Sequence, residues 1–365
     1  MAIRFRIAKG ALLGLAVMLA PACTAQNPSD SVRLSFRGQV SSFTESAASI
    51  YLTSYDSGNS STYYLNAFDK NGKKNWEIKT QTDGRIYALR DGKFFYASKS
   101  GEVAFYNEQG TLLWKTTLAL DEFSNSNFLL TASGALLVNL QSSPDPATVY
   151  CQISIEGQKT ISPEIPNLST CYTFNYPLGG YISVGYTGDQ WAISRISDNF
   201  SVEWTYSGEM HEDNFFIQDI SPNGDVLFSG NTTGAGSTFL KELDPAGQVA
   251  KSATYQSPHI VAAYFQDQIV AAADKLGVLE ADFTLKATYD FCLYPKIKIL
   301  EDSFFVYSPG SYSRGASVTY DGYCKQYDKT NRLVFGQVFE ASDQFFEIGE
   351  NGKRFVVSAG IIHNP

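Results

Sequence analysis

The chain has 365 residues and a formal net charge of −9, from 28 basic and 37 acidic side chains. This balance argues against nucleic acid as a partner, because such binding needs a concentrated positive field. Aromatic residues make up 14% of the chain and 29 residues are glycine, which is typical of many short strands joined by turns. We therefore expect one large all-β domain, spanning residues 32–365.

The first 22 residues have the pattern of a signal peptide. A basic start is followed by an apolar segment of about ten residues, which is too short to span a bilayer. Small residues precede Cys23, as in a bacterial lipobox, although Ala20–Ala22 also fits ordinary secretory cleavage. We expect lipid attachment at Cys23, a polar tether over residues 23–31, and membrane association of an outer-membrane lipoprotein that faces the periplasm. A secreted or soluble periplasmic protein is the alternative.

Four further cysteines suit an exported protein: Cys151, Cys171, Cys292 and Cys324. An even number of cysteines in an oxidising compartment favours disulfides. Of the three possible pairings, we favour Cys151–Cys171 with Cys292–Cys324, because each pair spans only neighbouring strands. The alternative is that these side chains are small buried hydrophobic groups.

A turn motif recurs along the chain at intervals of about 40 residues, which indicates a repeat architecture. An acidic or amide residue opens the turn, glycine follows three positions on and tryptophan seven positions on, as in Asp69, Gly72 and Trp76 and again in Asn107, Gly110 and Trp114. The opening side chain can bond the nearby backbone, glycine accepts a positive φ, and the strand beyond delivers an aromatic ring to a packed face. Weaker copies begin at Ser154, Ser197, Asp244, Asp282 and Asp328, with Trp204 and Phe335 at the seventh offset of the fourth and seventh copies.

Short apolar runs set the expected number of units. Eight of them recur, at residues 50–52, 94–96, 136–138, 181–184, 226–228, 269–271, 304–306 and 355–357. Such runs are typical of strands buried on both faces, and four strands per repeat is the pattern of a β-propeller blade. We predict a β-propeller of four-stranded antiparallel blades, with eight blades favoured over seven. We expect the outer strand of the last blade to come from Val32–Arg37, which would close the ring.

The segments Ala67–Trp76 and Phe105–Trp114 resemble the repeat of the pyrroloquinoline-quinone (PQQ)-like β-propeller superfamily, whose fixed points are the glycine and the tryptophan. The chain lacks the threonine that precedes the glycine in that repeat. Lipoprotein propellers of this kind include a subunit of the outer-membrane β-barrel assembly machinery, so the resemblance implies a non-catalytic scaffold in envelope or outer-membrane protein assembly. Quinoprotein dehydrogenases of similar fold use a pair of adjacent cysteines beside the quinone, and this chain has no such pair.

Candidate catalytic and metal-binding groups are sparse, and the only histidines are His211, His259 and His363. The segment Glu209–Asp213 gathers carboxylates around His211 and is a candidate metal loop. We prefer to interpret it as a solvated connection, and we expect no metal, no cofactor and no catalytic set. The expected protein is a monomeric scaffold for an unidentified envelope partner. A periplasmic or secreted propeller enzyme or sugar-binding protein, with its site at the mouth of the central channel, is the alternative.

Overall fold

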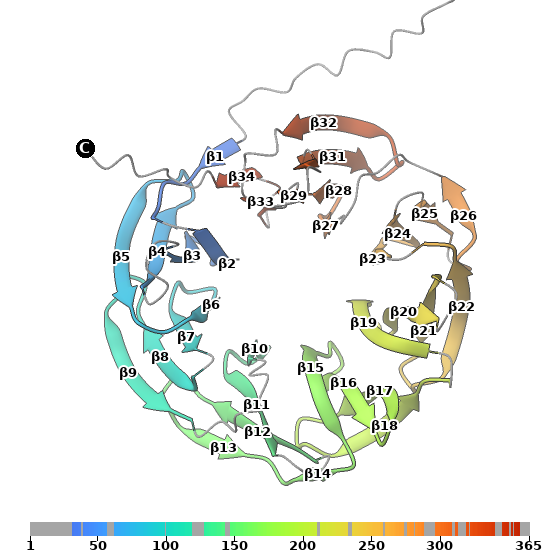
Figure 1. Ribbon diagram of the computed structural model, residues 1–365, viewed down its shortest axis with the longest axis horizontal. Coiled ribbons are helices and arrows are strands. Elements are labelled where there is room, and N and C mark those ends of the chain that lie inside the picture. Colours follow the sequence, from blue (N-terminus) through green and yellow to red (C-terminus); the bar gives the residue numbers. More distant parts are fainter. Residues whose placement is uncertain are drawn as a thin grey trace, which may run out of the picture.

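The computed structural model describes residues 31–357, with gaps at residues 38, 57–61, 99, 119–127, 143–146, 210–211, 233–235, 258–259, 274–275, 281, 288–295, 309–310, 313–318, 321, 340–344, 350–351 and 353. The described residues form strands and turns and contain no helix. Their sheets stand side by side around a central opening, each with its first strand innermost (Figure 1). Cys23, Cys292, the three histidines and the predicted signal peptide lie outside the described residues.

Most sheets are antiparallel meanders of four consecutive strands. The first two comprise β2 (Gln39–Glu45), β3 (Ser49–Tyr55), β4 (Tyr63–Asp69) and β5 (Lys74–Thr80), then β6 (Gly84–Ala88), β7 (Phe94–Ser98), β8 (Glu102–Tyr106) and β9 (Leu112–Thr117). The third comprises β10 (Phe128–Leu130), β11 (Leu136–Ser142), β12 (Ala147–Ile153) and β13 (Lys159–Ile161), with β14 (Ile165–Pro166) also pairing with β12.

The later sheets repeat this order. The fourth and fifth comprise β15 (Ser169–Asn175), β16 (Tyr181–Thr187), β17 (Gln190–Ile196) and β18 (Val202–Ser207), then β19 (Glu212–Ile220), β20 (Val226–Thr232), β21 (Thr238–Leu243) and β22 (Val249–Tyr255). The sixth comprises β23 (Val261–Phe265), β24 (Gln268–Ala273), β25 (Leu276–Leu279) and β26 (Leu285–Ala287). The seventh comprises β27 (Lys296–Ile299), β28 (Ser303–Ser308), β31 (Gly322–Asp328) and β32 (Leu333–Phe339), with the separate β29 (Ser311–Tyr312) and β30 (Thr319–Tyr320) pair inserted in sequence.

The remaining sheet joins the two ends of the chain and corrects one prediction. Here β1 (Ser31–Arg33) pairs in parallel with β34 (Arg354–Val357), which pairs antiparallel with β33 (Phe345–Ile348). Among the described residues this sheet therefore has three strands, one of them paired in parallel, where four antiparallel strands were expected. The direction has a simple cause: β1 leads into the innermost strand β2, as every outer strand leads into the next sheet. β1 therefore runs in the direction of an outer strand, but it pairs directly with β34, the second strand of its sheet.

Beyond Arg33, the predicted N-terminal strand packs instead of pairing. Leu34 and Phe36 are 1% and 5% exposed and join the hydrophobic cluster of Ile50, Leu52 and Phe68 in the first sheet. The N-terminal segment thus contributes a short strand to the last sheet and apolar side chains to the first.

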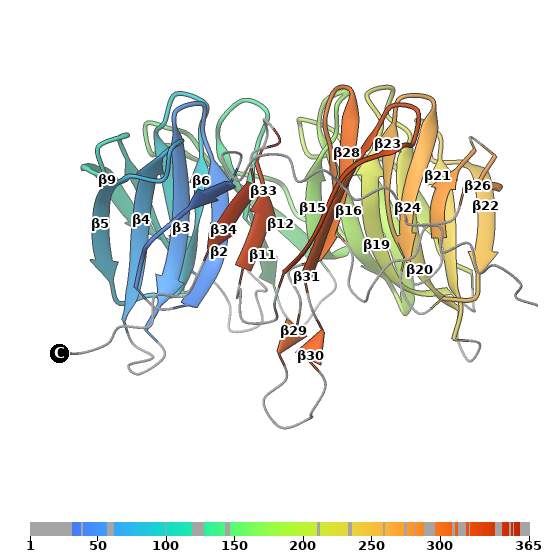
Figure 2. The same cartoon turned by 90° about the horizontal axis from the view of Figure 1, so that it is seen from above.

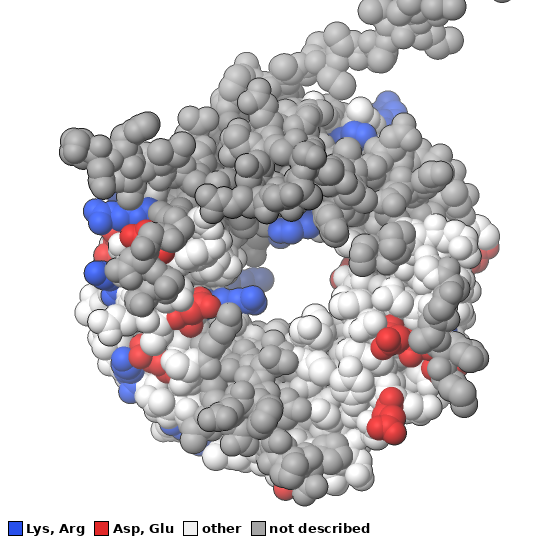
Figure 3. Space-filling view, viewed as in Figure 1, with Lys and Arg blue, Asp and Glu red and all other residues white. Residues whose placement is uncertain are grey.

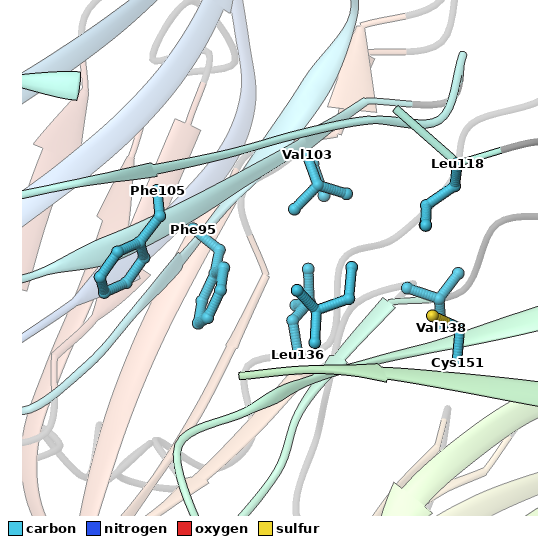
Figure 4. Close-up of a cluster of buried hydrophobic side chains, with 9 residues drawn as sticks. Phe95, Val103, Phe105, Leu118, Leu136, Val138 and Cys151 are labelled. Carbon is cyan, nitrogen blue, oxygen red and sulfur yellow. The ribbon is translucent and has the colours of Figure 1, made fainter. Parts of the chain in front are cut away.

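The core lies between the sheets rather than at one centre. In β3 every residue from Ser49 to Ser54 is buried, and β21 is buried throughout, whereas the outer strand β22 alternates between exposed and half-buried residues. Figure 4 shows one inter-sheet cluster, in which Phe95, Val103 and Phe105 of the second sheet face Leu136, Val138 and Cys151 of the third. Each sheet is thus held mainly by its two neighbours.

The two ends of the ring differ. The short turns that join first to second strands and third to fourth strands lie at one end, which we call the short-turn face (Figure 2). The β29 and β30 pair lies at the opposite end, which we call the long-loop face.

Candidate functional site

The tryptophans of the repeat each dock on the turn of the following sheet. The indole Nε1 of Trp76 donates to the backbone oxygen of Glu108 at 2.9 Å, Trp114 Nε1 donates to Ile155 at 2.7 Å, and Trp204 Nε1 donates to Pro245 at 3.0 Å. A tryptophan N–H needs an acceptor when its ring is packed, and the turn carbonyl supplies one. These contacts give Trp76, Trp114 and Trp204 a structural role at the boundaries between sheets.

Two structural constraints require glycine in each contacted turn. Gly110 and Gly247 have φ values of 77° and 79°, which side chains other than glycine rarely adopt. A Cβ atom at Gly110 would also lie 3.0 Å from the ring of Trp76, and one at Gly247 would lie 2.6 Å from the ring of Trp204. The repeat position thus combines backbone geometry with close approach of the preceding sheet's indole.

The opening residues of the turns stabilise the same geometry. Asp69 Oδ1 accepts hydrogen bonds from the backbone N–H groups of Asn71 and Lys73, both at 2.9 Å. Asn107 Oδ1 accepts one from Thr111 N–H at 2.8 Å, and the N–H of Gly72 closes the first turn by donating to Asp69 O at 3.0 Å. The motif therefore uses its polar groups within the turn.

Two later copies depart from the expected pattern. The sixth turn begins at Glu280 rather than Asp282, because the N–H of Phe283 donates to Glu280 O at 3.0 Å and Phe283 has a φ of 70°. Asp282 instead accepts from Thr284 N–H at 2.9 Å, inside the turn. In the last copy, Phe335 is 8% exposed and belongs to a cluster with Phe305, Tyr307, Cys324 and Ile348.

The expected disulfide between Cys151 and Cys171 is not made, because Cys151 has a free thiol. Side chains alternate along β12, so Tyr150 faces the fourth sheet, where it packs with Leu168 and Tyr181. Cys151 consequently points the other way, into the cluster with Phe105 and the rest of the second sheet's inner residues (Figure 4). The Cys292–Cys324 pair stays a prediction, since Cys292 lies outside the described residues.

The candidate metal loop is anchored by an internal ion pair. Glu212 contacts Lys241 Nζ and accepts from Tyr206 OH at 3.1 Å, while Lys241 Nζ donates to Tyr206 OH at 3.0 Å. Asp213 accepts from the indole N–H of Trp191 at 2.6 Å. Within the described part of the chain, no three His, Cys, Asp or Glu side chains are grouped closely enough to hold a metal ion.

The ion pair between Lys241 and Glu212 is almost completely buried from solvent. The side chains of Lys241 and Glu212 are 6% and 8% exposed. Burial disfavours the ammonium ion, but Glu212 and Tyr206 outweigh burial and hold the pKa of Lys241 above its ordinary value. Sequence reasoning did not find this pair, because Glu212 on β19 and Lys241 on β21 lie on non-adjacent strands, with β20 between them.

A second polar cluster lies at the next boundary. Glu242 forms an ion pair with Lys251 at 2.6 Å and accepts from Tyr264 OH at 3.0 Å. Asp219 accepts from the backbone N–H of Tyr264 at 2.8 Å, and burial raises the pKa of its carboxyl group. Both clusters connect sheets and leave their carboxylates fully occupied.

The central opening is lined by a different set of side chains. Arg85 is exposed on the innermost strand β6, and Lys296 is exposed at the start of β27. Figure 3 shows basic side chains at the border of the opening. On the inner strands β15 and β19, Tyr172 and Phe216 are 46% and 49% exposed. These residues make the opening the best candidate ligand site.

A second exposed feature lies on the rim. Leu112 and Leu113 at the start of β9 are 48% and 50% exposed, and Ile155 in the neighbouring turn is 40% exposed. Trp114, the next residue on β9, donates to the backbone oxygen of Ile155 at 2.7 Å and so ties the start of β9 to that turn. We call Leu112, Leu113 and Ile155 the aliphatic patch. Leu333 and Val334 form a similar exposed pair on β32, at 47% and 49%.

Comparison with solved structures finds 498 similar chains. One is the C-terminal WD40 domain of Sif2, with a TM-score of 0.52, 12% identity, and coverage of 81% of this chain and 86% of that one. Another is KlHsv2 with its loop 6CD replaced by a Gly-Ser linker, with a TM-score of 0.50, 10% identity, and coverage of 83% and 98%. The chain is a β-propeller. Its sheets are accordingly called blades below.

BamB from Moraxella catarrhalis is also similar, with a TM-score of 0.44, 14% identity, and coverage of 69% of this chain and 75% of that one. No protein-family model matches the sequence, and no curated protein matches it. Among the described residues of the propeller, no helix is long and apolar enough to cross a membrane.

Proposed function

We propose that the protein is a non-catalytic interaction scaffold of the bacterial envelope. It is an eight-bladed propeller whose ring is closed by the sheet of β1, β34 and β33. Lipid on Cys23 holds it at the outer membrane, facing the periplasm, where it binds a protein partner in envelope or outer-membrane protein assembly. Small residues before Cys23 and the polar tether of residues 23–31 support the anchor.

The observation that carries the scaffold function is the aliphatic patch on a rigid rim. Isolated exposed leucines are ordinary, but three large aliphatic side chains exposed on one strand and on the turn bonded to it favour a surface that a partner covers. The patch is also fixed in place, because Trp114 bonds the turn that carries Ile155 at 2.7 Å. A rigid apolar surface loses little conformational entropy when a partner binds.

Site-specific photo-crosslinking in intact bacterial cells that produce this protein tests this function. A photoreactive amino acid at Leu113 is expected to capture one defined envelope protein, whereas the same group at Lys79, an exposed residue of the outer strand β5, is expected to capture none. Absence of a product at both positions, or identical products at both, would contradict the scaffold. Mass spectrometry of the mature N-terminus tests the anchor separately, through the mass of diacylglycerol on Cys23.

A further inference from the structure

Two basic residues of the inner strands have no counter-ion among the described residues, whereas several basic residues away from the channel have one. Lys115 on the outer strand β9 pairs with Glu102 at 2.7 Å, and Arg195 on the third strand β17 pairs with Glu203 at 2.8 Å. Arg85 is exposed on the inner strand β6 and Lys298 is half-buried on the inner strand β27, and neither forms an ion pair with another described residue. The positive charge at the channel wall is therefore available to a ligand.

The carboxylates of the inner strands are occupied instead. Glu45 pairs with Lys70 at 3.1 Å, Glu212 pairs with Lys241, and Asp213 and Asp219 accept hydrogen bonds from Trp191 and from the backbone of Tyr264. The inner strands thus use their described negative groups within the walls and leave Arg85 and Lys298 unneutralised. In a protein of net charge −9, this local excess of positive charge is the reverse of the overall balance.

Aromatic side chains occupy the other part of the wall. Tyr172 on β15 and Phe216 on β19 project from neighbouring blades, while β6 and β27 lie across the opening from them (Figure 1). Tyr, Phe and Arg are residue types that protein-binding surfaces favour. A ligand that fits must present carboxylates toward one part of the wall and apolar groups toward the other.

We propose that the central channel binds an extended acidic polypeptide segment of the partner. Its carboxylates contact Arg85 and Lys298, and its apolar side chains pack on Tyr172 and Phe216. A low-dielectric protein wall strengthens the field of the two cations, although the protein as a whole has a net charge of −9. That net charge repels a nucleic acid, and a sugar acid has no apolar side chain to bury against Phe216. This inference rests on the proposed scaffold function, since it names the chemistry of the partner.

Fluorescence anisotropy with the purified full-length protein tests the channel. The probe is a fluorescein-labelled peptide of alternating Glu and Leu, and the channel variant is Arg85→Glu with Lys298→Gln. The matched control is Lys79→Glu with Arg90→Gln, which changes the net charge equally at exposed positions outside the channel. We expect the channel variant to weaken binding by about tenfold or more and the control to leave it nearly unchanged. Phe216→Ala is expected to weaken binding, whereas Leu333→Ala is not.

Three results would overturn the inference: no binding of the peptide by the unmodified protein, equal weakening by both charge variants, or binding of polygalacturonate without binding of the peptide. Circular dichroism of each variant checks that the fold is retained. Failure here is distinguishable from failure of the scaffold, because crosslinking from Leu113 depends on the rim and not on Arg85. A captured partner together with an inert channel would leave the scaffold standing and reject the acidic segment.

Discussion

Trp76 Nε1 donates to the backbone oxygen of Glu108 at 2.9 Å, so a side chain of the first blade closes a hydrogen bond with the turn of the second. The ring of Trp76 also stacks on Phe94, with centroids 5.4 Å apart. One residue thus joins two blades by a polar contact and by packing.

Replacement of Trp76 should separate these two contributions. Trp76→Phe keeps much of the packing and loses the hydrogen bond, so we expect a loss of about 1 kcal/mol in the free energy of unfolding. Trp76→Ala loses both, and we expect about 2 kcal/mol or more, because the residue is half-buried. Urea denaturation followed by circular dichroism measures both values. Equal stability of the alanine variant and the unmodified protein would reject the role of Trp76 between blades.

Gly247 allows the contact with tryptophan to be separated from backbone strain. Gly247 and Gly188 both have positive φ, at 79° and 61°, but a Cβ at Gly188 would meet nothing within 4 Å. Gly188→Ala should therefore cost about 1 kcal/mol, the usual penalty of the left-handed region. Gly247→Ala should cost about 1–3 kcal/mol more, because the methyl group collides with Trp204. Thermal unfolding of both variants gives the comparison.

The double variant Trp204→Ala with Gly247→Ala provides the control for this interpretation. If the collision is the cause, the alanine at position 247 should cost less in the absence of the indole ring than in its presence. Additive losses would show that Gly247 is required only for its φ.

The buried ion pair of Lys241 and Glu212 leads to a prediction about the stability lost when one charge is removed. Lys241→Met leaves Glu212 buried without its counter-ion, and we expect a loss of about 3–5 kcal/mol. Lys241→Met with Glu212→Leu removes both charges and should recover most of that loss. Urea denaturation of the two single variants and the double variant forms the cycle. A double variant as unstable as the sum of the single variants would contradict coupling between these side chains.

The pH dependence of this pair follows from the raised pKa of Lys241. The folded state holds the proton more tightly than the unfolded chain, so the contribution is complete below the ordinary lysine pKa. It is lost as the pH rises through the higher folded value. Stability conferred by the pair should therefore stay constant through neutral pH and decline only in strongly alkaline solution. Denaturation curves of the protein and the double variant at increasing pH would show the two converging there.

Sequence reasoning succeeded where one blade resembles the next. The offsets of Gly72 and Trp76 are local, so their repetition at Gly110 and Trp114 is visible without coordinates, and the apolar runs predict the buried second strands. It failed at Asp282, because a bulky Phe283 takes the position that glycine or asparagine holds elsewhere. Sequence alone gives no reason to expect phenylalanine at a φ of 70°.

The features that depend on contacts between distant strands were not predictable in the same way. Lys241 on β21 meets Glu212 on β19 across the intervening strand of the fifth blade, and the availability of Arg85 depends on what its neighbours bond. The parallel pairing of β1 depends on chain direction at the junction of the two ends. The Cys151–Cys171 expectation failed because proximity in sequence does not report the alternation of side chains along β12.

The last prediction concerns the reactivity of the Cys151 thiol. Its side chain is 1% exposed in an apolar cluster, and burial raises the pKa of the thiol, although Lys159 acts in the opposite direction. The thiolate is the reactive form, so iodoacetamide should label Cys151 very slowly in the folded protein and rapidly in urea. Cys151→Ser should destabilise the protein by about 1–3 kcal/mol, because it places a hydroxyl group among apolar side chains, and Cys151→Ala should cost less. Peptide mapping without reductant measures the labelling. A recovered peptide that links Cys151 to Cys171 would contradict the buried thiol.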